Sequence, residues 1–146
     1  MDYRSGNIGR VFWARLEDGE ALTPALESLA KKENVDQAVV LLLGALGEGR
    51  MVSGPRENVI PPDPMFTTFT KGREIVAIGT IARDQNGPKV HMHAAAGRLG
   101  EETNVGCLRA ECNIYMLCEA VILEITGLKA TRDPDPASGF DLLTFK

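Results

Sequence analysis

Residues 88–95 read Pro-Lys-Val-His-Met-His-Ala-Ala, a short segment in which two histidines alternate with apolar side chains. In a β-strand, side chains two positions apart point to the same face. An extended segment would therefore present the imidazoles of His91 and His93 to one point, while Met92 faces the opposite way. These are the only histidines in the chain. The segment is predicted to be a strand, at 89–95, with a polar pair on one face.

The segments on both sides of this strand are predicted to be strands as well. Upstream, residues 84–88 read Asp-Gln-Asn-Gly-Pro, and Asn-Gly is the strongest short-range hairpin signal. Downstream, residues 98–106 form a polar connection that contains glycine. The strands predicted in this part of the chain are 66–69, 74–82, 89–95, 114–125 and 140–145, with a loop at 132–139. The pattern indicates an antiparallel meander.

The first third of the chain is predicted to form a β-α-β unit. Residues 9–16 have the β-branched and aromatic character of a strand. Thr23 suits a helix N-cap and Pro24 the first helical position, and apolar residues recur at helical spacing until Asn34. Residues 38–43 (AVVLLL) are a continuous apolar run, which is typical of a strand buried on both faces.

Between this unit and residue 66, little regular structure is expected. A short strand is predicted at 49–53, and residues 58–64 are a loop because their three prolines cannot join a strand ladder. A chain of 146 residues is the usual size of one domain. The prediction is a single α+β domain over residues 1–146, mainly antiparallel sheet with one principal helix after the first strand.

Composition places the chain among ordinary folded proteins, with 44% hydrophobic and 25% charged residues. No window approaches the ~18 apolar residues that span a bilayer, and no basic segment followed by an apolar stretch opens the chain. The three cysteines, at 107, 112 and 118, fit neither a disulfide framework nor a Cys-x-x-Cys zinc knuckle. We therefore expect a cytoplasmic protein without a membrane partner.

The charge distribution argues against DNA as a strong partner. The formal net charge is −4, and the sixteen lysines and arginines are dispersed, with no run longer than Lys31-Lys32. Neutralisation of phosphates dominates affinity for nucleic acids, so a DNA-binding surface normally shows clustered basic residues. Oligomerisation could still gather basic side chains onto one face.

Several short motifs, taken in order, resemble the PPC-domain family, which is shared by plants and prokaryotes. The family pattern is P-x-h-H-x-H, a glycine-rich turn, G-G-H-L, and a strand with E-h-h-I, where h is apolar. Here residues 88–95 are followed by Val-Gly-Cys-Leu at 105–108 and Glu-Ala-Val-Ile at 119–122. Gly9-Arg10 and Gly44-Ala45-Leu46 also fall where the family places similar residues.

The resemblance implies an α+β fold with one helix packed on antiparallel strands, commonly assembled as a homotrimer. It implies no securely established reaction for the free-standing prokaryotic members. The plant AT-hook core, Arg-Gly-Arg-Pro, is absent from this chain. Since that hook is the part that enters the minor groove, the resemblance does not by itself predict DNA binding.

At the second motif, Cys107 stands where the family has a third histidine. Imidazole nitrogen and thiolate sulfur are both good zinc ligands, so His91, His93 and Cys107 are the candidate ligands of zinc or a similar divalent metal. Three ligands with an open fourth position are typical of a catalytic-type site. The alternative is a lost site, with a polar stripe on a half-exposed strand and a small buried cysteine.

A more remote similarity of fold, to acetolactate decarboxylase, favours the enzyme among the hypotheses but leaves it open whether the chain is one. That enzyme holds zinc through a His-x-His strand and a later histidine, and its zinc acts as a Lewis acid on a small acid. No residue of this chain independently indicates that substrate, so the fold-level similarity leaves the reaction open.

Three other side chains have weaker functional interpretations, and two cysteines have a structural one. Glu119 interrupts an apolar run and is a candidate general acid or base, or it pairs with an arginine such as Arg109 or faces solvent. Arg109 and Arg132 are candidates for binding an anionic substrate, or they are solvated surface residues. Cys112 and Cys118 lie in or beside an apolar strand and are expected in the core.

Three functions therefore remain in order of preference. The first is a metal-binding protein, or enzyme, for a small molecule, which rests on His91, His93 and Cys107. The second is a DNA-associated regulator, which the net charge and the missing hook oppose. The third is an assembly or sensor module without catalysis.

Overall fold

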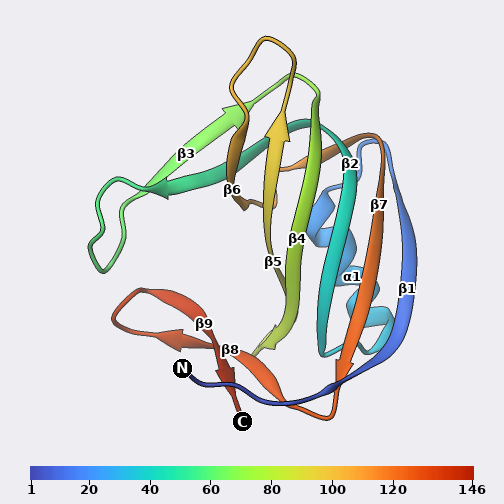
Figure 1. Cartoon of the computed structure of the whole chain (residues 1–146), viewed down its shortest axis with the longest axis vertical. Coiled ribbons are helices and arrows are strands. Elements are labelled where there is room, and N and C mark those ends of the chain that lie inside the picture. Colours follow the sequence, from blue (N-terminus) through green and yellow to red (C-terminus); the bar gives the residue numbers. More distant parts are fainter.

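Nine strands and one helix make up the chain, and the structure, a computed structural model, describes all 146 residues. The single helix follows the first strand, as predicted (Figure 1). The strands are β1 (Asn7–Glu17), β2 (Gln37–Pro55), β3 (Pro64–Phe69), β4 (Arg73–Asp84), β5 (Gly87–Gly97), β6 (Asn104–Leu108), β7 (Asn113–Thr126), β8 (Ala130–Asp135) and β9 (Phe140–Phe145), and the helix is α1 (Leu22–Glu33). The helix is neither long nor apolar enough to cross a membrane.

All nine strands belong to one sheet in the order β1-β7-β2-β6-β5-β4-β8-β9, with β3 paired to β2. Every pairing is antiparallel except the single parallel contact between β4 and β8. In the β-α-β unit, β7 lies between β1 and β2 and pairs with both. The α+β class and the mainly antiparallel sheet are confirmed.

Strand β2 closes part of the sheet into a ring, because its two halves pair with different strands. Residues 37–46 pair with β4 and β7, whereas 49–55 pair with β3 and, at two positions, with β6. Since β4 pairs with β5 and β5 with β6, the pairings β2-β4-β5-β6 return to β2. At the closure Gly106 lies so close to β2 that an added Cβ would stand 2.1 Å from the carbonyl oxygen of Val52.

The hydrophobic core lies between α1 and the inner face of the sheet. Leu22, Leu26 and Ala30 of the helix have no exposed surface. The helix ends as predicted at Asn34, whose φ of 55° places it in the left-handed region that asparagine tolerates. The predicted N-cap was wrong, because Ala21 precedes the first helical residue and Thr23 is buried inside the first turn.

Several other local predictions need correction. Pro64, predicted to lie in a loop, is the first residue of β3 and pairs with Pro55, and the predicted connection at 98–106 ends where β6 begins at Asn104. Residues 38–43 are buried on one face only, since Leu41 and Leu43 are 42% and 55% exposed. The separate strand predicted at 49–53 is the continuation of β2, and the loop predicted at 132–139 begins as strand β8. In the hairpin, Asp84 pairs with Gly87, so the turn residues are Gln85-Asn86, one position before Asn-Gly.

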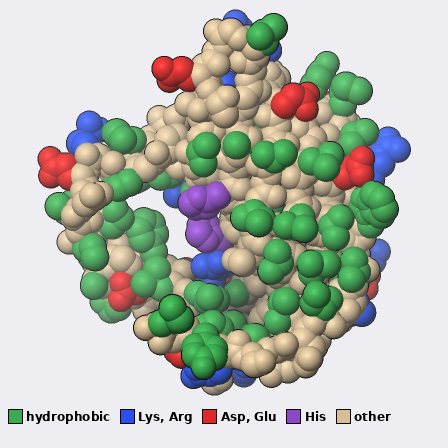
Figure 2. Space-filling model, in the orientation of Figure 1, with side chains coloured by type: hydrophobic (Ala, Val, Ile, Leu, Met, Phe, Trp, Pro, Cys, Tyr) green, Lys and Arg blue, Asp and Glu red, His purple; other side chains and the backbone are tan.

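The face of the sheet opposite α1 is largely apolar and exposed, and we call it the outer face. Figure 2 shows hydrophobic side chains gathered there beside the two histidines. Residues paired across neighbouring strands share a face, and one such row runs from Trp13 through Val121, Leu41, Ile78 and His93 to Cys107. Its exposed large apolar residues on β1, β2 and β4 include Val11, Trp13, Leu41, Leu43, Val76 and Ile78.

Candidate metal centre

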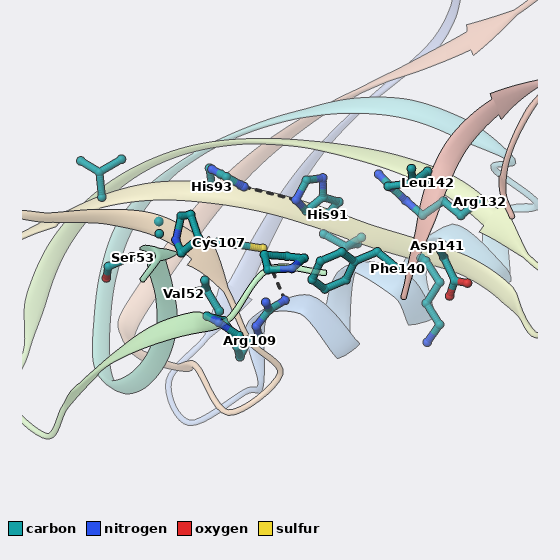
Figure 3. Close-up of a pocket in the computed structure, with 18 of the residues that line it drawn as sticks. Val52, Ser53, His91, His93, Cys107, Arg109, Arg132, Phe140, Asp141 and Leu142 are labelled. Carbon is teal, nitrogen blue, oxygen red and sulfur yellow. Dashed lines mark hydrogen bonds between the residues drawn. The ribbon is translucent and has the colours of Figure 1, made fainter. Parts of the chain in front are cut away.

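The pairing of β5 with β6 brings the three predicted ligands together. His93 lies directly opposite Cys107 in the antiparallel ladder, and His91 is on the same face two residues earlier. The Nε2 atoms of the two histidines are 3.2 Å apart, and Figure 3 shows their rings turned toward each other. The three donor atoms of His91, His93 and Cys107 lie within 4.8 Å of one another.

These separations fit a common ion. Two nitrogens that each lie ~2.0–2.1 Å from one tetrahedral zinc ion are roughly 3.3 Å apart, which matches the distance between the two Nε2 atoms. For one zinc ion to bind all three donors, Sγ of Cys107 must lie roughly 3.5 Å from each nitrogen, and the three atoms are within 4.8 Å of one another. The set of two imidazoles and one thiolate is suited to zinc.

The surroundings affect the protonation of the donor groups. The pKa of His91 is lowered chiefly by partial burial and further by the positive charges of Arg132, His93 and Arg109. A neutral imidazole is the form that binds metal. Burial raises the pKa of the Cys107 thiol, while Arg109 and Arg132 act in the opposite direction. The thiol therefore keeps its proton until a metal ion displaces it.

A pocket of about 660 Å³ opens beside the triad. It is hollowed between the sheet, the β2–β3 arm and the β8–β9 hairpin, and Figure 2 shows the histidines at its edge. The lining side chains outside the triad include Val52, Ser53, Val105, Arg109, Arg132, Phe140, Asp141 and Leu142. A volume of this size is typical of a site for a small molecule.

The structure brings both predicted arginines to this pocket. Arg109 donates a hydrogen bond from Nη1 to Sγ of Cys107 at 3.5 Å. Arg132 donates from Nη2 to Oγ1 of Thr80 at 3.0 Å, and Thr80 is paired with His91 in the ladder. The two guanidinium groups therefore lie beside the triad rather than on solvated outer surface.

Sequence reasoning did not include Phe140 and Leu142 in the site. Both lie on β9, whose strand character was predicted, but both are exposed and line the pocket. The sequence around an apolar residue does not indicate whether its side chain lines a pocket or packs in the core. Only the placement of the β8–β9 hairpin beside β4 brings them there.

Glu119 is not brought to the site. It lies on β7 and accepts a hydrogen bond from Nε1 of Trp13 at 3.2 Å. Three strand steps separate β7 from β5, or roughly 14 Å at ~4.8 Å a step. Within this subunit Glu119 is therefore no acid or base for a ligand at the triad, and its suggested partner Arg109 contacts Cys107 instead.

The other two cysteines are core residues, as predicted. Cys112 and Cys118 have no exposed surface, and their thiols donate to the backbone carbonyls of Arg50 and Ala45. Burial raises the pKa of Cys118 to about 11, so this thiol stays protonated. Neither one lines the pocket, which leaves Cys107 as its sole thiol.

Comparison with known proteins agrees with this architecture. Two solved structures each have a TM-score of 0.86 and cover 99% of this chain. One is a metal-containing protein from Archaeoglobus fulgidus, 21% identical, of which 99% is covered. The other is a plant- and prokaryote-conserved protein from Pyrococcus horikoshii, 23% identical, of which 97% is covered. A candidate DNA-binding protein from Ralstonia eutropha has a TM-score of 0.77 at 19% identity, with 92% of this chain and 90% of that chain covered. These likenesses show the fold.

A curated relative, the bifunctional protein GlmU of Synechococcus sp. strain JA-3-3Ab, is 28% identical over 134 residues. The match covers 90% of this chain but only 20% of the relative, so the chain spans about a fifth of that protein's length. The model of the Plants and Prokaryotes Conserved (PCC) domain matches residues 3–126. That range includes the helix, both histidines and Cys107, and the chain belongs to the Plants and Prokaryotes Conserved domain family.

Proposed function

We propose that this protein is a homotrimer that binds one zinc-like divalent ion per subunit at His91, His93 and Cys107, and binds or acts on a small molecule in the adjoining pocket. The observation that carries the proposal is the separation of 3.2 Å between the two Nε2 atoms, with a thiol opposite them at the wall of the pocket. The metal-containing relative from Archaeoglobus fulgidus agrees with it.

Some residues of the site would bind the metal ion, and others would bind the small molecule. His91, His93 and Cys107 supply three donors on one side, which leaves the pocket side open to a ligand atom. A zinc ion held there would act as a Lewis acid toward an oxygen of that ligand. The apolar walls would exclude water from the ligand, and the arginines would favour negative charge.

The outer face supports self-assembly. At least six large apolar side chains of β1, β2 and β4 are exposed on this one face, so they form a patch and are not isolated surface hydrophobics. In a closed trimer, neighbouring copies of this chain would cover this face through heterologous contacts. A copy packed beside β1 would also protect the open edge of that strand. Because the histidines share this face, a neighbouring subunit would also border the pocket.

Zinc binding to the untagged protein tests the metal site. We expect about one zinc per subunit in a titration against a chromophoric chelator, and His91→Ala or His93→Ala should reduce this sharply. Cys107→His should retain binding because imidazole replaces thiolate as a ligand. Cys112→Ser is the matched control, since Cys112 lies in the core, and its zinc content should be unchanged. Full zinc binding by His91→Ala would refute the proposed site.

A further inference from the structure

The arginines of this chain fall into two groups. Eight of the ten have a carboxylate within 4.0 Å. The two that have none are Arg109 and Arg132, and both line the pocket beside the triad. Because a guanidinium group matches the planar geometry of a carboxylate, an arginine that lacks a carboxylate inside a pocket is suited to hold one from a ligand.

Arg132 is held in place by a hydrogen bond, but one of its side-chain donors has no partner in the chain. Its Nη2 donates to Thr80, while its Nε is enclosed and has no hydrogen-bond partner. Asp141 also lines the pocket and its charge stabilises protonated Arg132, yet the two do not form an ion pair. Buried donors without partners are rare in folded proteins, so this guanidinium is a candidate for a partner from outside the chain.

Of the other charged groups of the pocket, Asp84 and Lys89 are already engaged, whereas Asp141 adds a negative charge near Arg132. Asp84 accepts hydrogen bonds at Oδ1 from the backbone N–H groups of Asn86 and Gly87, which fix the hairpin turn. Lys89 pairs with Glu27 of the helix at 3.3 Å. The free positive charge is therefore that of the two arginines, and Figure 3 shows them flanking His91 and Cys107.

Part of the lining of the pocket is apolar. Val105, Phe140 and Leu142 line it and are exposed, although large apolar side chains are normally covered. Phe140, Leu142 and Arg132 all belong to the β8–β9 hairpin, which lies beyond the range of 3–126 that matches the family model. This hairpin therefore contributes both a charged and an apolar part of the ligand site.

We infer that the ligand is a carboxylic acid with an aromatic or branched apolar body. Its carboxylate would accept hydrogen bonds from Arg132 and Arg109, and its body would lie against Phe140 and Leu142. The inference deepens the proposed function and rests on it for the identification of this pocket as the ligand site. It makes the β8–β9 hairpin the element that determines specificity.

Phenylacetate is a suitable probe, because it combines a carboxylate with an apolar ring. Its binding to the untagged full chain would be followed by NMR chemical shifts, in metal-free and in zinc-loaded protein. Phenylacetamide has the same shape without the charge, and acetate has the charge without the ring. A hydrogen-bonded charge contributes ~1.5–3 kcal/mol, so we expect phenylacetamide to bind at least about tenfold more weakly. Acetate should also bind more weakly, because it lacks contact with Phe140 and Leu142.

Variants of single residues test whether binding depends on these two arginines in particular or on the positive charge of the protein in general. Arg132→Gln and Arg109→Gln should each weaken phenylacetate binding by about tenfold or more, and Arg132→Lys should restore part of it. Lys32→Gln removes one positive charge from the exposed end of α1 and should leave binding unchanged. Thermal unfolding of each variant checks that it is folded. If Arg132→Gln unfolds, Arg109→Gln carries the test.

The two proposals fail in different ways. Equal binding of phenylacetate and phenylacetamide, or undiminished phenylacetate binding by both glutamine variants, overturns the inference even if zinc binds. No phenylacetate binding to protein that does bind zinc overturns it as well. Charge-selective phenylacetate binding by protein that takes up no zinc upholds the inference and overturns the metal site instead.

Discussion

At the scale of single residues, Cys107 decides which ions the site would accept and how strongly it would polarise a ligand. Thiolate is a soft donor that disfavours magnesium and calcium, which prefer oxygen ligands. It also carries one negative charge, so a divalent ion bound here would keep a smaller net charge than one bound by three neutral imidazoles. Arg109, which donates to Sγ of Cys107, would draw some of that charge away from the metal.

A second residue-scale feature is the ion pair between Arg10 and Glu124, which ties β1 to β7. Two side-chain nitrogens of Arg10 donate to the carboxylate, at 2.8 and 2.9 Å, and its backbone N–H donates at 3.1 Å. The hydrogen bonds from Arg10 lower the pKa of Glu124 to about 2 from its ordinary 4.5. A depressed carboxyl pKa stabilises the fold above the unfolded value and loses this effect as the pH falls from about 4.5 to about 2.

We therefore expect Glu124→Gln to lower the stability of the fold at pH 7 by a small but measurable amount, since Arg10 is half exposed and solvent screens the pair. The difference from the unmodified protein should shrink as the pH is lowered from 4.5 toward 2. Thermal unfolding over this pH range measures it. Glu17→Gln, in the exposed pair with Arg15, should have little effect. A loss for Glu124→Gln that does not change with pH would contradict this account.

Residue-scale prediction from the sequence succeeded where the pattern was local. The period of two in a strand was enough to bring His91 and His93 together. The register that places Cys107 opposite His93 is not encoded in any local pattern, and only the family resemblance suggested it. The same limit applies to Glu119, because its distance from the triad depends on which strands lie between them.

At the scale of elements, β2 organises the molecule because one strand serves two parts of the sheet. Sequence reasoning divided it at Gly44 and Gly47, since glycine usually weakens a strand interior. In the structure the strand bends there and continues to Pro55, so it carries both the helix-covered sheet and the wall of the pocket. The sequence therefore predicted that a strand is present better than it predicted where the strand ends. Pairing with other strands extends β2 past its glycines.

The closure of β2 on β6 provides a test at this scale. Gly106→Ala would place a Cβ 2.1 Å from the carbonyl oxygen of Val52, so the two strands must separate. We expect a loss of at least about 2 kcal/mol in unfolding free energy, comparable to other overpacked sites, together with weaker zinc binding because Cys107 moves. Urea unfolding and zinc titration measure the two effects.

Gly47→Ala is the matched control for this substitution. The nearest atom to its added Cβ is 3.6 Å away, on Tyr115, which is ordinary van der Waals contact. It should leave zinc affinity unchanged and stability within ~1 kcal/mol. If Gly106→Ala behaved like Gly47→Ala in both measurements, the closure would not be what positions Cys107.

At the scale of the whole molecule, the outer face explains why residues 38–43 seemed to be buried on both sides. Their alternate residues face the core and the outer face, and both sets are apolar. A sequence pattern reports that a side chain is apolar but not whether its own chain or another copy covers it. The exposure of this apolar face in one subunit therefore supports the proposed self-assembly.

Light scattering coupled to size exclusion tests this assembly. We expect a homotrimer at micromolar concentration, and we expect Val76→Glu to dissociate it, because a carboxylate would be buried in the apolar contact. Val76 is 65% exposed in the subunit, so the fold should tolerate the change. Leu99→Glu, at a fully exposed position on the β5–β6 connection, should remain trimeric. A monomer of the unmodified protein would contradict the proposal.

The charge of the whole molecule predicts weak DNA binding. With a net charge of −4 and eight of ten arginines paired to carboxylates, few basic groups remain for phosphates. We expect affinity for duplex DNA in the non-specific range of ~10⁻⁴ to 10⁻⁶ M at physiological salt. Fluorescence anisotropy with duplexes of different sequence measures this. Sequence-dependent binding at nanomolar concentration would instead favour the regulator.

The central claim is that His91, His93 and Cys107 share one metal ion, and anomalous diffraction tests it most directly. Crystals of the untagged protein soaked with zinc chloride would be measured above and below the zinc absorption edge. We predict one anomalous peak per subunit, ~2.0–2.1 Å from Nε2 of both histidines and ~2.3 Å from Sγ of Cys107. No peak at the triad in zinc-soaked crystals, with the two Nε2 atoms still hydrogen-bonded to each other, would contradict the claim.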